Sequence, residues 1–235
     1  MIRGRGRKAA EVRDKLEPIG RVELFVTRGA PVLTLTDQCD RPGIPREFRH
    51  LFPPAYRHHD LSFSGCDVIE KQDIRNILVN FGKDQVVSGL TSGFVHPVMR
   101  MAVGDRGTIP SDLTVPKTPV ATQTALFNEI FRADLDATVL NVGTPTVHEA
   151  KFIKTFSAVV IPLTAFSNQS QPVVNEIGLI TADVLGGAAF PRAAVASPAT
   201  PPTDERLFSI RTFKSVPFEA ANEIAVTIRY TIFIE

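Results

Sequence analysis

The residues of this 235-residue chain that are best suited to chemistry are its histidines and carboxylates. Three of the five histidines, His50, His58 and His59, lie in one short region, and Asp60 follows directly. Histidine and aspartate are good ligands for first-row metals, so a metal site is one interpretation. However, adjacent residues of an extended chain point to opposite faces, and this spacing matches no metal-binding motif. We therefore favour a loop with ordinary surface histidines and expect no bound metal.

No motif marks a catalytic pair among the carboxylates. The sequence contains no Gly-x-Ser-x-Gly, His-Glu-x-x-His, Walker-type or Cys-x-x-Cys motif. A Gly-x-x-Gly spacing occurs at 104–107, but no Lys-Ser/Thr follows it, which argues against a nucleotide site. A glycosidase needs only two carboxylates at a set distance, and the scattered ones do not exclude this. Sugar-processing clefts are rich in aromatic side chains, whereas this chain has no Trp and two Tyr. We therefore expect no enzyme, no catalytic residue and no cofactor.

The bulk composition narrows the classes of protein further. The 26 basic and 25 acidic residues give a net charge of +1, which offers no general argument for nucleic acid or an anionic membrane. No apolar run approaches the length of a membrane-spanning helix, and no apolar stretch follows the charged N-terminus as in a secretory signal. Two cysteines, Cys39 and Cys66, are too few for a disulfide framework; free thiols are the simpler interpretation, although the sequence leaves their pairing open.

The apolar pattern predicts a mainly β protein with short strands joined by turns. Proline and glycine are spread along the chain, and aliphatic residues alternate with others from Ala221 to Ile234. That alternation predicts a central strand of an antiparallel sandwich. A Gly186–Gly187 turn predicts a hairpin, because glycine accepts positive φ. Further strands are expected at 22–35, 94–107, 138–142, 149–163, 173–183, 188–194 and 206–216.

Two helices are also expected. From Cys66 to Gly82, apolar residues recur with helical spacing, and Gly82 would end the helix. From Thr122 to Ala137 a second stripe recurs, with Glu129 and Arg132 one turn apart as an exposed ion pair. The predicted fold is an antiparallel β-sandwich or jelly-roll-like domain in the C-terminal part, with two short helices and an extended N-terminal arm.

The predicted organisation has four parts: a basic arm at 1–20, a mixed strand and helix region at 21–107, a Pro-rich linker at 108–120, and a helix plus sandwich at 121–235. The arm would contact phosphates or an acidic neighbour, or remain a solvated terminus; we favour an arm that becomes ordered on assembly over one that contacts DNA. The candidate inter-subunit contacts lie in the arm and in the irregular segment 37–60: Arg3, Arg5, Arg7, Lys8, Phe48, His50 and Phe52.

Four stretches in the same order resemble phrases found in proteins of tailed bacteriophage particles, in particular tail-collar and tail-fibre-associated proteins. They are Met-Ala-Val-Gly-Asp-Arg-Gly at 101–107, Leu-Phe-Asn-Glu-Ile-Phe-Arg at 126–132, Val-Asn-Glu-Ile-Gly-Leu at 174–179, and the alternating C-terminal strand. The resemblance covers roughly residues 74–235.

This resemblance implies a virion structural subunit with no catalytic site, which is made in the host cytoplasm and built into the neck, collar or tail. Its partners would be copies of itself in a ring and other neck, tail or fibre proteins, without a membrane. A receptor- or carbohydrate-binding tail-fibre or baseplate module is the alternative, and the scarcity of Trp and Tyr speaks against it.

Overall fold

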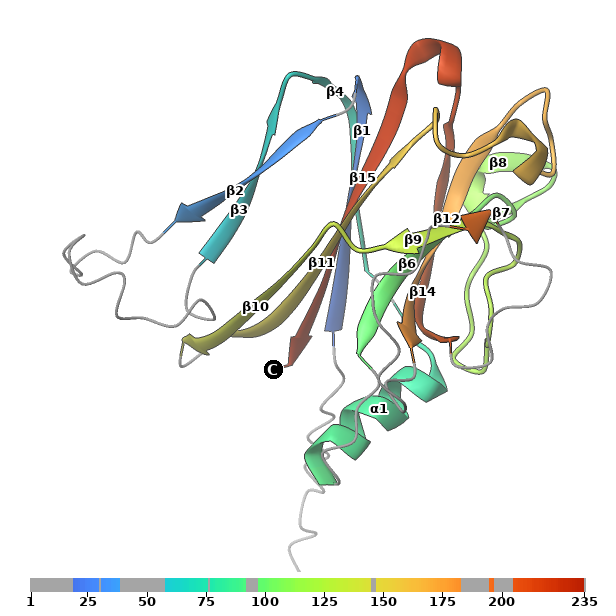
Figure 1. The fold of residues 1–235 in the computed structure, drawn as a ribbon. Helices are drawn as coiled ribbons and strands as arrows, with labels where there is room; N and C mark the ends of the chain where they lie inside the picture. The colour runs from blue at the N-terminus through green and yellow to red at the C-terminus, as the bar shows by residue number, and fades with distance from the viewer. Residues whose placement is uncertain are drawn as a thin grey trace, which may run out of the picture.

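The computed structural model describes residues 19–29, 31–38, 58–75, 77–91, 97–144, 147–182, 195–196 and 205–234. Within these residues the protein is mainly β, as predicted, and two antiparallel sheets face each other as a sandwich (Figure 1). One hydrophobic cluster joins the sheets, because it contains residues of both, such as Leu24 and Ile177.

The five-stranded sheet contains the last strand of the chain at its centre. Its order is β10 (Ala137–Thr144), β11 (Val147–Ser157), β15 (Ile224–Ile234), β1 (Ile19–Arg28) and β4 (Asp67–Arg75). Val226, Ile228 and Tyr230 are buried, and they pair with Val26, Leu24 and Val22 of β1. The central strand predicted from alternation is therefore confirmed.

The six-stranded sheet forms the second layer. Its order is β13 (Val195–Ala196), β9 (Glu129–Asp134), β6 (Val98–Gly104), β12 (Val173–Ala182), β14 (Glu205–Pro217) and β5 (Ile77–Leu78). Met101 and Val103 of β6 alternate toward the core, beside Ile177 and Leu179 of β12. The sandwich is thus not confined to the C-terminal part, since β1, β4 and β5 precede residue 79.

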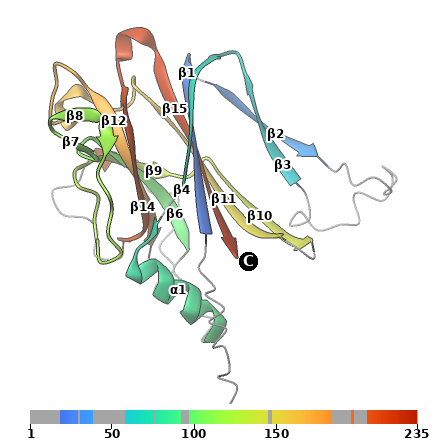
Figure 2. The same ribbon diagram turned by 180° about the vertical axis from the view of Figure 1, so that it is seen from behind.

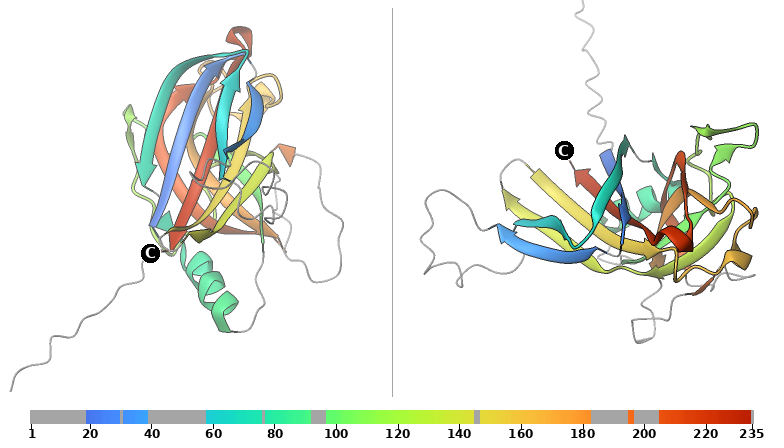
Figure 3. Two further views of the ribbon diagram at one scale, coloured as in Figure 1. Left: turned by 90° about the vertical axis from the view of Figure 1, so that its left-hand side faces the viewer. Right: turned by 90° about the horizontal axis from the view of Figure 1, so that it is seen from above.

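Two hairpins extend from the sandwich. One pairs β2 (Val32–Gln38) with β3 (His58–Ser64), and the other pairs β7 (Thr108–Ile109) with β8 (Asp112–Pro116). They lie on opposite sides of the molecule (Figure 2). The β2–β3 hairpin lies on the outer side of the five-stranded sheet (Figure 3), where Thr27, Ile153 and Thr227 are buried although they face away from the core between the sheets. His58 to Asp60 belong to β3, so the loop predicted for them is wrong.

The helix predicted from Cys66 to Gly82 is wrong, because this segment forms β4 and β5. β4 pairs along β1, and its Ile69, counted in the predicted apolar stripe, is half exposed. The single α-helix among the described residues, α1 (Asn80–Thr91), begins where the prediction ended. Gly82 lies in its first turn, where a Cβ would meet the Phe208 carbonyl oxygen at 2.1 Å, so glycine lets α1 approach β14.

The helix predicted from Thr122 to Ala137 is also wrong. Residues 121–128 cross the surface without helix or strand, and β9 follows. Leu126 and Ile130 are buried as expected, but from a loop and a strand. Glu129 and Arg132 do form the expected ion pair, although they lie on a strand and are largely buried rather than exposed.

Several predicted features lie outside the described residues: the arm up to residue 18, most of the 37–60 segment, the Gly186–Gly187 turn and the strand at 188–194. Residues 19 and 20, assigned to the arm, begin β1.

Candidate functional site

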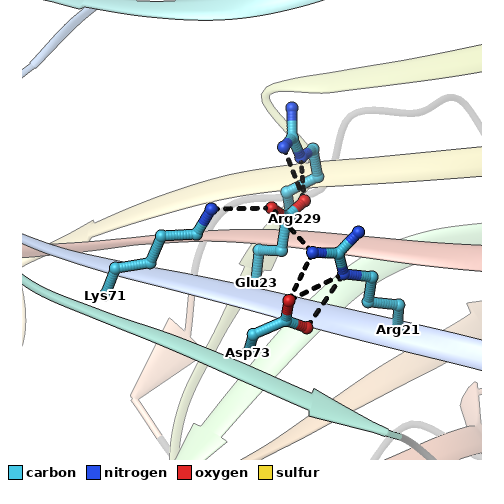
Figure 4. Close-up of polar contacts among 5 residues, drawn as sticks. All are labelled: Arg21, Glu23, Lys71, Asp73 and Arg229. Atoms are coloured by element: carbon cyan, nitrogen blue, oxygen red, sulfur yellow. Dashed lines mark hydrogen bonds and ion pairs between the residues drawn. The ribbon is translucent and has the colours of Figure 1, made fainter.

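A charged cluster lies on the outer face of the five-stranded sheet and is built by three strands (Figure 4). Strand register places Glu23 of β1 between Arg229 of β15 and Asp73 of β4. Glu23 Oε2 accepts from Arg229 Nε at 2.6 Å, and Lys71 Nζ lies 3.1 Å from Glu23 Oε1. Arg21 Nε donates to both oxygens of Asp73, at 2.9 and 3.0 Å. Three cations and two anions therefore fix β1, β4 and β15 to one another.

Within this cluster, the surroundings of one carboxyl group lower its pKa and so favour its charged form. The hydrogen bond from Arg21 lowers the pKa of Asp73 below its ordinary value, and nearby cations add to this. Both side chains of that pair are about half exposed, so solvent screens the interaction. Glu23 is buried, and the aromatic ring of Phe25 lies beneath Lys71 Nζ at 5.1 Å. These groups bind one another, so the cluster is suited to joining strands rather than to proton transfer.

A second charged cluster lies in the six-stranded sheet and is almost fully buried. Arg100 Nε lies 2.8 Å from Asp134 Oδ1, and Arg100 Nη1 lies 3.4 Å from Glu205 Oε1. Arg132 pairs with Glu205 Oε2 and donates from Nη2 to Glu129 Oε2 at 2.8 Å. Burial raises the pKa of Glu129, and the contact with Arg132 opposes that rise. Two arginines thus contact three carboxylates across β6, β9 and β14.

Two small recesses adjoin this buried cluster. One, of about 260 Å³, is lined by residues 124–129, Arg132, Ile180 and residues 205–207. The other, of about 270 Å³, is lined by Asn80, Phe81 and residues 121–124 and 205–207. The carboxylates of Glu129 and Glu205 that border the first recess are held by Arg132, so neither is positioned as an unpaired general base. Among the described residues, no group of three or more His, Cys, Asp or Glu is placed to hold a metal ion.

A third polar cluster is built around Glu176, which is fully buried in β12. Its Oε1 accepts from the backbone N–H groups of Asn128 and Arg106, at 2.8 and 3.2 Å, and its Oε2 accepts from that of Phe127 at 2.7 Å. Burial raises the pKa of Glu176, and the three N–H groups oppose that rise. The carboxylate therefore binds the loop that contains Arg106 and the loop that contains Phe127 and Asn128 to strand β12. A Cβ at Gly104 would lie 2.5 Å from Glu176 Oε1, which explains the glycine there.

The neighbouring residue, Asn175, binds the same region, at the point where the pairing of β12 with β14 shifts register. Its Oδ1 accepts from the Gly107 N–H at 2.6 Å, and its Nδ2 donates to the Asp105 carbonyl at 3.2 Å. Asp105 in turn accepts from the Ser167 N–H at 2.5 Å, which attaches the loop after β11. Three of the four stretches that carry the bacteriophage resemblance, 101–107, 126–132 and 174–179, therefore meet here.

The loop between β11 and β12 displays apolar side chains to solvent. Val159, Val160 and Leu163 are 73%, 59% and 51% exposed. Ile161 and Phe166, from the same loop, are buried in the core. The backbone is fixed at both ends: Ala158 N–H donates to the Ile224 carbonyl at 2.9 Å, and η3 (Leu163–Ala165) follows. We call Val159, Val160 and Leu163 the apolar turn; these three side chains are exposed while the loop is anchored by buried neighbours.

The sequence did not single out the apolar turn as a contact surface. It predicted a strand from Glu149 to Leu163, whereas β11 ends at Ser157. Pro162 was the available signal, because proline is disfavoured inside a paired strand. The predicted inter-subunit contacts, by comparison, all lie outside the described residues: Arg3, Arg5, Arg7, Lys8, Phe48, His50 and Phe52. Cys66 carries a free thiol, and Cys39 is not described.

Among the residues that the structure describes, no helix combines the length and apolar character that a membrane span requires. No model of a known protein family matches the chain, and comparison with curated proteins gave no significant match.

Proposed function

We propose that this chain is a structural subunit of a tailed bacteriophage particle. It assembles with copies of itself into a ring at the neck, collar or tail, and it holds neighbouring tail or fibre proteins through its arm and loops. The resemblance described above is the source of the phage assignment. Its support in the structure is that three of the resembling stretches adjoin and that their polar residues hold loops on strands. Such residues shape a scaffold rather than a reaction centre.

The observation that carries the assembly role is the apolar turn. Fully burying an exposed Val or Leu side chain contributes roughly 1.5–3 kcal/mol, so the three on this loop would favour an interface centred on them. In the two charged clusters and in the polar cluster around Glu176, the polar groups bind one another or the backbone within the fold. The apolar turn, by contrast, leaves its side chains exposed, and exposed apolar side chains are suited to contact with a neighbouring protein.

Replacing Val159 and Leu163 with serine is expected to reduce the assembled mass of the purified protein, measured by sedimentation and by electron microscopy of negatively stained samples. Because both side chains are exposed, the free energy of unfolding should change by less than about 0.5 kcal/mol. The matched control is the Leu113→Ser/Val115→Ser variant of β8, whose side chains are 43% and 42% exposed. A wild-type chain that stays monomeric, or a turn variant that assembles like the wild type, would contradict the proposal.

A further inference from the structure

The β10 strand is the outermost described strand on one side of the five-stranded sheet. It pairs with β11 from Ala137↔Ile153 to Asn141↔Glu149, and no described strand pairs with its other side. Figure 1 shows β10 at the rim of the molecule. An edge of this kind presents a row of backbone N–H and C=O groups that a further strand can bind.

The other three edges of the two sandwich sheets carry features that oppose such pairing. β5 and β13, the edges of the six-stranded sheet, are two residues long. β4, the opposite edge of the five-stranded sheet, has a register shift beside Ile69 and five charged residues: Asp67, Glu70, Lys71, Asp73 and Arg75. Short strands, bulges and charges are the usual means by which proteins protect sheet edges.

β10 has neither charge nor proline. Four of its eight residues, two threonines and two valines, are good strand formers. The irregularity in its pairing with β11 lies near its end, between Asn141 and Thr144, so the strand is regular over Ala137–Asn141. Of the four edges of the two sandwich sheets, β10 is therefore the one whose sequence favours the addition of a strand.

We propose that β10 pairs antiparallel with β10 of a second copy of this chain, so that the two five-stranded sheets become one ten-stranded sheet. A neutral strand is complementary to itself, because a two-fold contact brings each residue opposite another of the same strand. The two-fold axis passes between one residue and its own copy, so facing residues lie an even number of positions apart. If the regular stretch pairs about its middle, Val139 lies opposite Val139 and Ala137 lies opposite Asn141 of the other copy, and no like charges meet. The inference rests on the proposed role as a self-assembling subunit, and it makes the repeating unit of the ring a dimer.

The test is a charge swap in β10 of the full chain. Ala137→Lys/Asn141→Lys places lysines opposite lysines in the two-fold register, and the dimer should dissociate at concentrations at least about tenfold higher than for the wild type. Ala137→Lys/Asn141→Glu places opposite charges there and should restore the dimer. The control, Val68→Lys/Ile69→Lys on β4, should leave the mass unchanged. The readouts are sedimentation and, for the fold, far-ultraviolet circular dichroism.

Each outcome bears on the inference. Dissociation of the first variant with recovery in the second supports it. A first variant that keeps the wild-type mass, dissociation of both β10 variants, or dissociation of the β4 control alone overturns it. Larger assemblies that persist regardless of charge in β10 would overturn the β10 contact and leave the proposed function standing. A β10-dependent dimer that forms no larger assembly would support the β10 contact and contradict the proposed function.

Discussion

Replacing Glu176 with alanine is expected to lower the free energy of unfolding by about 4 kcal/mol, because three buried backbone N–H groups lose their acceptor. Each unsatisfied group costs about 1–3 kcal/mol, and the cost of burying the carboxylate itself, which the variant avoids, offsets part of the sum. Urea denaturation followed by circular dichroism would measure the change.

Two further variants make this test specific. Glu176→Gln keeps the side-chain shape and one acceptor oxygen, so it should lose about half as much stability as the alanine variant. Glu219→Ala removes an exposed carboxylate whose partner is Asn222, three residues away, and should cost less than about 0.5 kcal/mol. A loss below about 1 kcal/mol for Glu176→Ala would show that this carboxylate does not hold the two loops.

Replacing Arg132 with methionine is expected to cost about 3 kcal/mol at neutral pH, because it leaves Glu129 and Glu205 buried without this counter-charge. Methionine retains most of the side-chain volume, so the charge is the main change. The control is Lys154→Met, which removes the partner of Asp136 from a more exposed pair and should cost less than about 1 kcal/mol.

The loss in the Arg132 variant should also depend on pH. Burial already raises the pKa of Glu129 from 4.5, and removing Arg132 raises it further. A carboxyl with a raised pKa in the folded state takes up a proton on folding. The stabilisation from that proton is complete below the unfolded pKa and is lost as the pH rises through the folded pKa. The variant should therefore lie closer to the wild type at pH 5 than at pH 8. An equal difference at both values would show that the charge of Glu129 is not the cause.

The sequence predicted a strand correctly where one face of the strand packs on the core and its apolar residues therefore alternate. It predicted helices wrongly where apolar residues recurred at helical spacing although the segment pairs with a distant strand. In β15 the aliphatic residues alternate because their side of the strand meets the core, and the strand was predicted from them. In β9, Ile130, Phe131 and Ala133 are all buried, so no period of two was visible. In β4, apolar residues happened to recur at helical intervals, and pairing with β1 overrode that preference.

The polar clusters were only half visible in the sequence. In the sequence, Asn175 and Glu176 are two polar residues flanked by apolar ones, but nothing near them in the sequence identifies their partners. Glu176 binds the Arg106 backbone, 70 residues away, and Arg132 pairs with Glu205, 73 residues away. Strand register brings these groups together, and register depends on the whole sheet rather than on nearby residues. The apolar turn was missed for a different reason, because an apolar run ending at Pro162 resembles a strand until its burial is known.

The pairing of β1 with β15 has a consequence for how the protein is made. From Ile19↔Phe233 to Arg28↔Ile224, the first described strand lies beside the last one. During synthesis, β1 can gain this neighbour only after residues 224–234 have left the ribosome. A nascent chain interrupted before residue 224 lacks the middle of its five-stranded sheet, so only molecules translated past that point can reach the native state. Contacts between such distant segments also make folding slow.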